Sequence, residues 1–522
     1  MSANLPYRIL VGKDRCTVRF EGLVQGTDKP WLGVEWDDPS RGKHDGEKDG
    51  VRYFTCRIPA AGSFIRPTSV KIIRPTPFLG TLKTRYRPPP VAMNSVDSDV
   101  SPVEGVFLGG SNILVEAPNL DKIRRRLMNL VALRTIGVDE EAVAGLGPGE
   151  EDEMRSMGTW ESKTLNLAHT LFSNWTEVAQ IVNVLCRLET LNLNANRLAT
   201  LREPVSLPCF GQLKCLMLNN TLITWEEVLF IEPSLPNLTS LELSSNRIEK
   251  ICFPDGKERE IFPRLEELRL EWNEFTSWDN LNGLVTLRSL RLLSLSANRL
   301  PALDSSVRSL PPWLKFLNLA NNVVAGWKSI DVLGEKAFEL EGIVLRGNPL
   351  FTSVHQGMLR AGVIARLGSL RLIDGSDILD SERKDTEMYY LSRNPSFPEN
   401  TPGRSRWDSL VAKYGVSENP TGSMSTKPPN ASTLGDKLIN INLIHSSLSS
   451  PTILRVLPSM TLKICKLKIS RLTGLKPAEF QIVYLGTDDE IAEHVEDIWS
   501  DEKKTLGELG AERGGRIRID VC

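Results

Sequence analysis

The residues that decide the fold of this chain are Leu238-Thr-Ser-Leu-Glu-Leu-Ser-Ser-Asn-Arg-Ile248, where spaced leucines lead to a single asparagine. The pattern Leu-x-x-Leu-x-Leu-x-x-Asn-x-Leu returns along the chain with its asparagine at Asn196, Asn246, Asn273, Asn298, Asn322 and Asn348, and one further copy has Thr221 in that place. Neighbouring members of this series are 24 to 27 residues apart. A fixed period of this length predicts stacked structural units, each of which buries its leucines against the next.

The period and the pattern resemble the leucine-rich repeat family, which implies an α/β solenoid with strands on a concave face and helices on the convex face. We expect the solenoid over residues 106–390, closed by a degenerate repeat and a polar cap. Tryptophans just past the asparagine position predict the starts of convex helices, and they are Trp175, Trp225, Trp278 and Trp327. The leucines and asparagines are interpreted as structural. Partner binding is expected on the variable strand positions, which include Asn192, Asn194, Glu242, Arg269, Glu271, Trp272 and Arg346.

A different pattern precedes the repeats, within residues 1–80. Short runs rich in β-branched and aromatic residues alternate with glycines and predict a small β-barrel. Its sharpest feature is Gly42-Lys-His-Asp-Gly46, in which two glycines flank a cation and an imidazole. Because glycine allows backbone angles that other residues avoid, the loop is expected to project Lys43 and His44 beside exposed aromatic side chains. Such a groove suits an extended peptide that carries acidic and aromatic residues.

The glycine loop, the Trp31-x-Gly-Val-Glu-Trp36 segment before it and the aromatic residues after it resemble the CAP-Gly domain family. One position departs from the family's usual Gly-Lys-Asn-Asp-Gly loop, because His44 replaces the asparagine. The resemblance implies that the groove binds the acidic C-terminal tail of α-tubulin. The candidate tail-binding residues are Trp31, Trp36, Gly42, Lys43, His44, Asp45, Gly46, Phe54, Phe64 and Arg66. Some of the aromatic ones, among Trp31, Trp36 and Phe64, are alternatively core residues of the barrel.

A third module is predicted over residues 436–522. Two strand-like runs precede a segment with apolar residues at helical spacing, Leu462–Leu472, and further strand-like runs follow. This order resembles the α+β ubiquitin-like β-grasp fold, and Gly514-Gly515 is expected to form a turn because a strand follows it. Two segments connect the modules. One is a proline- and serine-bearing linker over 81–105, and the other is a connector over 391–435 with a short amphipathic helix at Arg406–Tyr414.

Charge and composition argue against several classes of function. The net charge is −2, although residues 1–90 carry 16 Lys and Arg against 9 Asp and Glu. Without an overall positive charge the chain is not expected to bind nucleic acid, whereas its basic first segment indicates an acidic protein partner. No run of about 18 apolar residues predicts a membrane span, and the eight cysteines contain no Cys-x-x-Cys pair typical of zinc sites. Five histidines without a triad pattern, and the lack of a phosphate loop, predict a protein that is not an enzyme and holds no cofactor or metal.

The order of the three modules resembles the tubulin-folding cofactor E family. That resemblance implies a cytoplasmic, cytoskeleton-associated chaperone that binds α-tubulin, with the CAP-Gly groove on its tail and the repeats on its body. It also implies joint action with tubulin-folding cofactors B, C and D in assembly and dissociation of the αβ-tubulin heterodimer. Two alternatives remain open: a microtubule plus-end adaptor, which would usually carry a coiled coil, and a ubiquitin-pathway substrate receptor.

Overall fold

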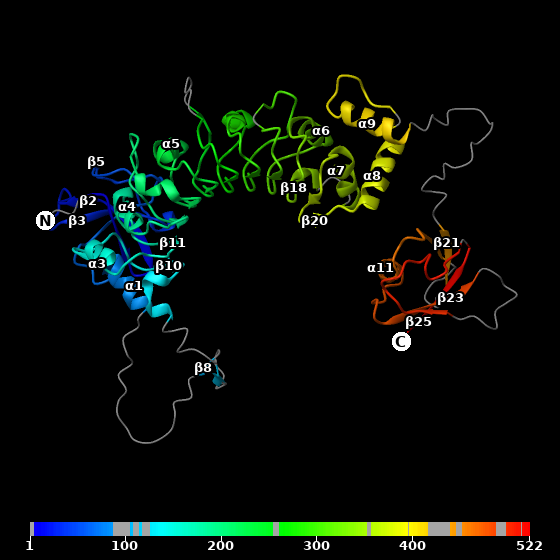
Figure 1. Ribbon diagram of the computed structural model, residues 1–522, viewed down its shortest axis with the longest axis horizontal. Helices are drawn as coiled ribbons and strands as arrows, with labels where there is room; N and C mark the ends of the chain where they lie inside the picture. The colour runs from blue at the N-terminus through cyan, green and yellow to red at the C-terminus, as the bar shows by residue number, and fades with distance from the viewer. Residues whose placement is uncertain are drawn as a thin grey trace, which may run out of the picture. The chain divides into compact units, whose positions relative to one another are not determined.

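The repeat pattern becomes a stack of parallel strands in the computed structural model of this chain (Figure 1). The structure describes residues 5–86, 105–107, 114–116, 126–253, 260–308, 310–351, 356–394, 396–415, 439–444, 452–486, 497–512 and 514–521. The chain divides into two units, Met1–Asn419 and Pro420–Cys522. Among the helices within the described ranges, none is long and apolar enough to cross a membrane.

Eleven strands of the first unit form one sheet, in the order in which they follow one another in the chain. Neighbours pair in parallel except the last two, and equivalent leucines such as Leu191, Leu216 and Leu241 lie opposite one another. The predicted solenoid is therefore confirmed, and its leucines form one continuous core. The strands are β10 (Thr135–Gly137), β11 (Thr164–Asn166), β12 (Thr190–Asn192), β13 (Cys215–Met217), β14 (Ser240–Glu242), β15 (Glu267–Arg269), β16 (Leu292–Ser294), β17 (Phe316–Asn318), β18 (Gly342–Val344), β19 (Leu372–Ile373) and β20 (Ser376–Asp377).

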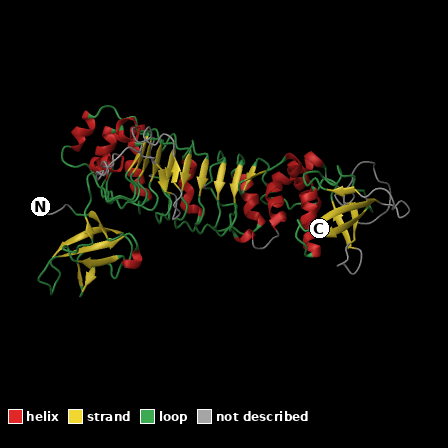
Figure 2. Ribbon diagram, turned by 90° about the horizontal axis from the view of Figure 1, so that it is seen from below, coloured by secondary structure: helices red, strands yellow, loops and turns green. Residues whose placement is uncertain are grey.

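The return segments of the repeats carry helices, while the strands stand in a row (Figure 2). The four predicted tryptophan starts are confirmed, because each tryptophan is the first residue of its helix. Caps in the sequence explain two of these starts: Asn174 accepts the backbone N–H of Glu177, and Thr224 forms a reciprocal capping box with Glu227. The helices of the array are η2 (Leu130–Ala132), α3 (Glu150–Ser156), α4 (Trp175–Val184), η3 (Pro208–Gln212), α5 (Trp225–Ile231), η4 (Glu232–Ser234), η5 (Trp278–Thr286), α6 (Trp327–Lys336), η6 (Pro349–Phe351) and α7 (Gln356–Arg366).

The repeated asparagines form a buried ladder. The side-chain nitrogen of Asn298 donates to the carbonyl of Leu270 in the preceding repeat at 3.0 Å and to that of Leu295 in its own repeat at 2.9 Å. Its side-chain oxygen accepts a backbone N–H of the preceding repeat. The other ladder asparagines donate in the same way to the preceding repeat, and Thr221 donates through its hydroxyl to a carbonyl at 2.8 Å. The structural interpretation of these asparagines is confirmed.

The N-terminal module is a five-stranded antiparallel sheet in the order β6-β3-β2-β1-β7. Its inner face is a small core built on Ile9, Val18 and Val34. The strands are β1 (Tyr7–Val11), β2 (Asp14–Gly22), β3 (Trp31–Trp36), β6 (Gly62–Ile65) and β7 (Ile72–Ile73), and a short helix η1 (Pro39–Arg41) and a hairpin of β4 (Glu47–Lys48) and β5 (Val51–Arg52) lie between β3 and β6.

The structure corrects the predicted boundary after the N-terminal module. Helix α1 (Phe78–Tyr86) belongs to the solenoid, because Phe78, Leu79 and Leu82 are completely buried in the core of the first repeats. The module therefore ends before residue 80, and the linker does not begin at 81. Residues 87–104 of the predicted linker lie outside the described residues, and a hairpin of β8 (Gly105–Phe107) and β9 (Leu114–Glu116) follows them.

The structure also corrects the connector after the repeats. The predicted amphipathic helix is present as α9 (Arg404–Tyr414), but it packs on the capping helix α8 (Asp380–Arg393) as part of the solenoid. The buried carboxylate of Glu387 accepts hydrogen bonds from Arg406 at 2.6 Å, Lys413 at 2.8 Å and Tyr414 at 2.7 Å. Residues 416–438 of the connector lie outside the described residues.

The second unit has the predicted β-grasp order of two strands, a helix and further strands. Its sheet runs β22-β21-β25-β23-β24, with β21 and β25 parallel, and helix α11 packs on one face through Leu462, Cys465 and Ile469. The predicted turn before the last strand is confirmed, since Gly514 has φ +88°. The elements are β21 (Ile439–Ile444), β22 (Thr452–Val456), α11 (Leu462–Thr473), β23 (Phe480–Gly486), β24 (Asp497–Trp499) and β25 (Arg516–Val521).

Candidate functional site

The glycine loop lies against strand β6 of the N-terminal sheet. The backbone N–H groups of Lys43 and His44 donate to the carbonyl of Gly62 at 2.7 and 3.2 Å, and the N–H of Gly62 donates back to the carbonyl of His44 at 2.8 Å. These bonds hold the backbone of the loop while the side chain of Lys43 remains exposed. The loop therefore presents an exposed cation from a backbone that is held against β6.

The two glycines of the loop are required for different reasons. Gly46 has φ +86°, and a Cβ there would lie 2.1 Å from the carbonyl oxygen of Phe54. Gly42 has an ordinary φ of −71°, so the prediction that it uses a forbidden backbone angle is wrong. A Cβ on Gly42 would instead lie 1.9 Å from the carbonyl oxygen of Ala60, so close backbone approach excludes a side chain.

His44 and Asp45 brace the loop from within. Nδ1 of His44 lies 3.0 Å from the backbone nitrogen of Gly46, and because a backbone N–H only donates, Nδ1 must accept. Burial lowers the pKa of His44, and the charge of Lys43 acts in the same direction against the opposing effect of Asp45. Asp45 accepts the backbone N–H of Cys56 at 3.2 Å. His44 therefore has one ring donor left for a ligand, Nε2–H, and protonating Nδ1 would break the loop bond.

The aromatic residues near the loop divide into core and surface. Trp36 is 4% exposed and Phe54 is 7% exposed. The core alternative is therefore confirmed for Trp36, and the expectation that Phe54 is an exposed aromatic residue beside the loop is wrong. Phe64 is half-buried, and its ring centroid lies 5.0 Å from that of His44. Two further members of this cluster, Phe20 and Tyr53, were not predicted from the sequence, and their ring centroids lie 6.3 and 5.5 Å from that of Phe64. Two sequence features could have indicated them: the alternating side-chain directions of strand β2 for Phe20, and the Tyr53-Phe54 pair for Tyr53.

The last two candidate residues lie together. The guanidinium of Arg66 stacks 3.6 Å from the ring centroid of Trp31, and both side chains are accessible at the surface of the sheet. A stacked cation and aromatic ring present a charge and an apolar face at once. Together with Lys43, His44 and Phe64 they form a surface that can bind an acidic, aromatic peptide, and we call these five residues the groove.

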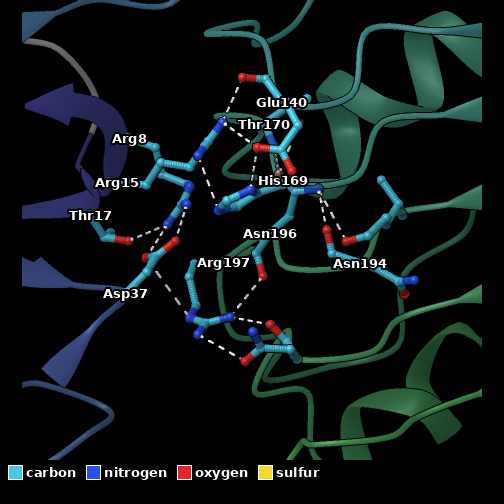
Figure 3. A network of polar contacts seen from close by, with 12 residues as sticks. Arg8, Arg15, Thr17, Asp37, Glu140, His169, Thr170, Asn194, Asn196 and Arg197 are labelled. Carbon is cyan, nitrogen blue, oxygen red and sulfur yellow. Dashed lines mark hydrogen bonds and ion pairs between the residues drawn. The ribbon is translucent and has the colours of Figure 1, made fainter. Parts of the chain in front are cut away.

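A polar network joins the N-terminal sheet to the first repeats (Figure 3). We call it the seam, and its members are Arg8, Arg15, Asp37, Glu140, His169 and Arg197. The guanidinium of Arg8, completely buried, makes two hydrogen bonds to the carboxylate of Asp37, at 2.9 and 2.6 Å. Asp37 in turn lies 4.0 Å from Nε of Arg197 in the solenoid.

A second part of the seam is built around Arg15. Its guanidinium donates to the carbonyl of Glu140 at 2.7 Å and lies 3.0 Å from Nε2 of His169. Since a guanidinium cannot accept, Nε2 of His169 accepts, and its Nδ1 donates to the Glu140 carboxylate at 2.6 Å. The groove and the solenoid therefore belong to one unit. No sequence pattern pointed to the seam, because its members come from separate segments of different character.

The predicted concave-face residues lie on or next to the strands, and several of them contact polar groups of neighbouring repeats. The side-chain oxygen of Asn194 accepts the backbone N–H of Asn219 at 2.7 Å, and Asn219 donates to Glu242 at 2.7 Å. Nε of Arg269 lies 3.7 Å from the Glu242 carboxylate. Trp272 differs from these polar residues because its side chain is 69% exposed. Within the described ranges, no group of three His, Cys, Asp or Glu side chains could hold a metal ion.

Comparison with known proteins agrees with the first and the last of the three modules. The family model described as CAP-Gly domain matches residues 7–70, and the one described as ubiquitin-like domain matches residues 438–520. Tubulin-specific chaperone E of Danio rerio is 31% identical over 504 residues, which cover 91% of this chain and 92% of that protein. The protein of the same name from Homo sapiens is 30% identical over 91% of both chains. Tubulin-folding cofactor E of Arabidopsis thaliana is 28% identical over 97% of this chain and 94% of its own.

Proposed function

This chain belongs to the tubulin-specific chaperone E family, and we propose that it is a tubulin-folding chaperone that holds the α-tubulin subunit at two places. The groove binds the acidic C-terminal tail of α-tubulin, and the solenoid binds its folded body. In this role the chain acts with tubulin-folding cofactors B, C and D on the αβ-tubulin heterodimer, in the cytoplasm and at the cytoskeleton. It contributes binding and no catalytic group.

The observation that carries the tail-binding proposal is the combination of groups in the groove. Lys43 is an exposed cation on a loop whose backbone is hydrogen-bonded to Gly62, and the half-buried ring of Phe64 lies beside the ring of His44 in the same loop. Arg66 adds a second cation on the ring of Trp31. A peptide that ends in carboxylates and an aromatic side chain can use all of these at once.

The seam supports binding at two places. Since it ties the sheet that carries the groove to the first repeats, a tail held in the groove keeps the rest of the same tubulin subunit near the solenoid. Tethering raises the effective concentration for the second contact, so two weak contacts give firm capture.

A titration of the full chain with a peptide of the α-tubulin tail tests this proposal. Lys43→Ala should weaken binding by about tenfold, because a charge-assisted contact on the order of 1.5 kcal/mol is lost. Lys48→Ala, which removes another exposed lysine of the same region, is the matched control and should bind like the wild type. Wild-type affinity should fall as salt rises, because exposed charges are screened over about 8 Å at physiological ionic strength. Equal affinities of the Lys43→Ala variant and the wild type would remove the loop from the site.

A pull-down with the full chain separates the proposal from the two alternative functions. Recovery of unpolymerised tubulin with the other cofactors agrees with the chaperone. Enrichment on microtubule ends would favour a plus-end adaptor, and recovery of proteasome or ligase subunits through residues 439–521 would favour a ubiquitin-pathway receptor.

A further inference from the structure

One position of the solenoid has a left-handed backbone in repeat after repeat. It is the residue directly before the ladder residue, and φ lies between +53° and +76° throughout. In the repeat before Asn196 the ladder position is held by Thr170, whose hydroxyl donates to the carbonyl of Leu167 at 2.8 Å. The N–H of this residue donates to the next repeat, as from Ser245 to the carbonyl of Glu271 at 2.9 Å and from Trp272 to that of Ser296 at 3.0 Å. The residues in this row are His169, Ala195, Asn220, Ser245, Trp272, Ala297, Asn321 and Gly347.

Most of the row is occupied by residues that suit this conformation. Glycine has no Cβ, asparagine tolerates the left-handed region through local hydrogen bonds, and alanine and serine are small. A bulky aromatic residue with positive φ is an outlier that costs free energy. Trp272 is such an outlier, and since its side chain is 69% exposed, burial does not offset that cost.

The other large residue of the row shows what this position can do. His169 is part of the seam, where its ring contacts Arg15 of the N-terminal sheet. Arg197, one position after a ladder asparagine, faces the carboxylate of Asp37 in the same seam. Residues on both sides of the ladder position thus hold a neighbouring domain, and an arginine there meets an acidic group.

The same edge continues along the solenoid to Trp272. Arg247 and Arg299 directly follow the ladder asparagines of the two repeats adjacent to that of Trp272, and both are exposed. An exposed tryptophan with arginines in the neighbouring repeats has the composition of a binding hot spot. The edge at Trp272 continues the edge that holds the N-terminal sheet in the seam, and its arginines are positively charged. It therefore fits a folded protein surface that has an apolar pocket bordered by carboxylates.

We propose that Trp272, with Arg247 and Arg299, anchors the folded body of the tubulin subunit whose tail the groove binds. This rests on the proposed function, and it assigns the second contact to the edge of the solenoid at Trp272 rather than to the polar network of the strands. The backbone of Trp272 takes part in the stacking of the repeats, while its exposed side chain serves binding and not the stability of the array.

The test uses Trp272→Asn in the full chain, since Asn220 and Asn321 occupy the same row. The melting temperature should stay equal or rise by about 1–3 °C, because asparagine relieves the left-handed strain. Affinity for αβ-tubulin should fall by about tenfold or more, as expected for a hot-spot tryptophan, while affinity for the tail peptide stays unchanged. Phe338→Asn, which removes a 59% exposed aromatic residue outside the row, is the matched control and should bind tubulin like the wild type.

A double variant, Arg247→Glu with Arg299→Glu, tests the charge of the site. It should also lose affinity for αβ-tubulin, and equally for tubulin from which the tails have been removed. The inference is overturned if Trp272→Asn binds tubulin like the wild type, or if it lowers the melting temperature by several degrees, which would mark Trp272 as structural. If the wild-type chain bound neither αβ-tubulin nor the tail peptide, the proposed function would be overturned, and this inference with it.

Discussion

The asparagine ladder inside the solenoid and the seam beside it are both buried polar networks, but the ladder is neutral and the seam contains charged groups. The ladder uses one neutral amide per repeat, and Asn298 satisfies its donors and its acceptor with backbone groups alone. The seam includes full charges from separate segments. The completely buried Arg8 forms an ion pair with Asp37 and also donates to the hydroxyl of Thr17 at 3.1 Å. A neutral network that the backbone completes is insensitive to pH, whereas a buried charge is stable only while its partner remains ionised.

The largest effect is expected in the seam, for Asp37→Ala. Removing the carboxylate leaves the guanidinium of Arg8 buried without its counter-charge, and breaking a buried pair in this way costs about 3–5 kcal/mol. Chemical denaturation of the full chain measures the loss. Asp28→Ala, at an exposed aspartate, is the control and should change stability by less than about 0.5 kcal/mol. A small loss in Asp37→Ala would mean that water replaces the carboxylate, and that the seam is not a buried ionic network.

Asp37 should also make the stability of the wild type fall at acidic pH. Burial alone would raise the pKa of Asp37, but the charge of Arg8 and its hydrogen bonds outweigh burial and lower that pKa below its usual 3.8. The contribution of Asp37 is therefore fully present above pH 3.8 and is lost as the pH falls through the lowered pKa. Melting curves between pH 2 and 5 (a range of about three units around the usual value) should show a steeper decline for the wild type than for Asp37→Ala.

A smaller effect that does not depend on pH is expected in the ladder, for Asn298→Leu. The carbonyls of Leu270 and Leu295 and a backbone N–H lose their partner, which costs about 1–3 kcal/mol. Denaturation at pH 5 and pH 7 should give the same loss. If stability were unchanged while tubulin binding fell, Asn298 would be a contact residue and the ladder interpretation would be wrong there.

The smallest effect is expected at the loop, where His44 takes a role that resembles a ladder asparagine. Its Nδ1 accepts the N–H of Gly46, and an asparagine oxygen can accept the same group, so His44→Asn should change stability at pH 7 by less than about 0.5 kcal/mol. The difference should appear in acid. Because burial lowers the pKa of His44 below 6.5, the wild type loses stability as the pH falls from 6.5 through that lowered pKa, and His44→Asn does not.

Melting curves of both proteins between pH 7 and 5 measure this difference (the range in which an imidazole near its usual value of about 6.5 titrates). Parallel curves would show that the His44 ring is not held as an acceptor. The affinity of the wild type for the tail peptide should also fall over this pH range. Protonation of His44 breaks its bond to Gly46, and this would change the position of Lys43 as well.

Local sequence predicted the elements that repeat or that depend on a few adjacent residues. The sequence was sufficient to identify the ladder positions, the tryptophans that start the helices, and the loop Gly42–Gly46. Each of these is marked by residues close to it in the chain: leucines, helix caps or glycines. Trp272 is also a candidate for partner binding from its place beside the strands, and that role stays a prediction. These features are decided over short distances in the chain, and sequence periodicity reports them directly.

Tertiary structure alone decided the rest, because those features depend on which distant residues meet. The partner of Arg8, the burial of Trp36 and Phe54, and the inclusion of α1 in the solenoid core all follow from packing between segments far apart in sequence. The left-handed backbone at Trp272 likewise comes from the stacking of the repeats, since its N–H must reach the carbonyl of Ser296 in the next one. Composition predicts that a side chain is aromatic or charged, but burial and partner decide whether it forms core, seam or binding surface.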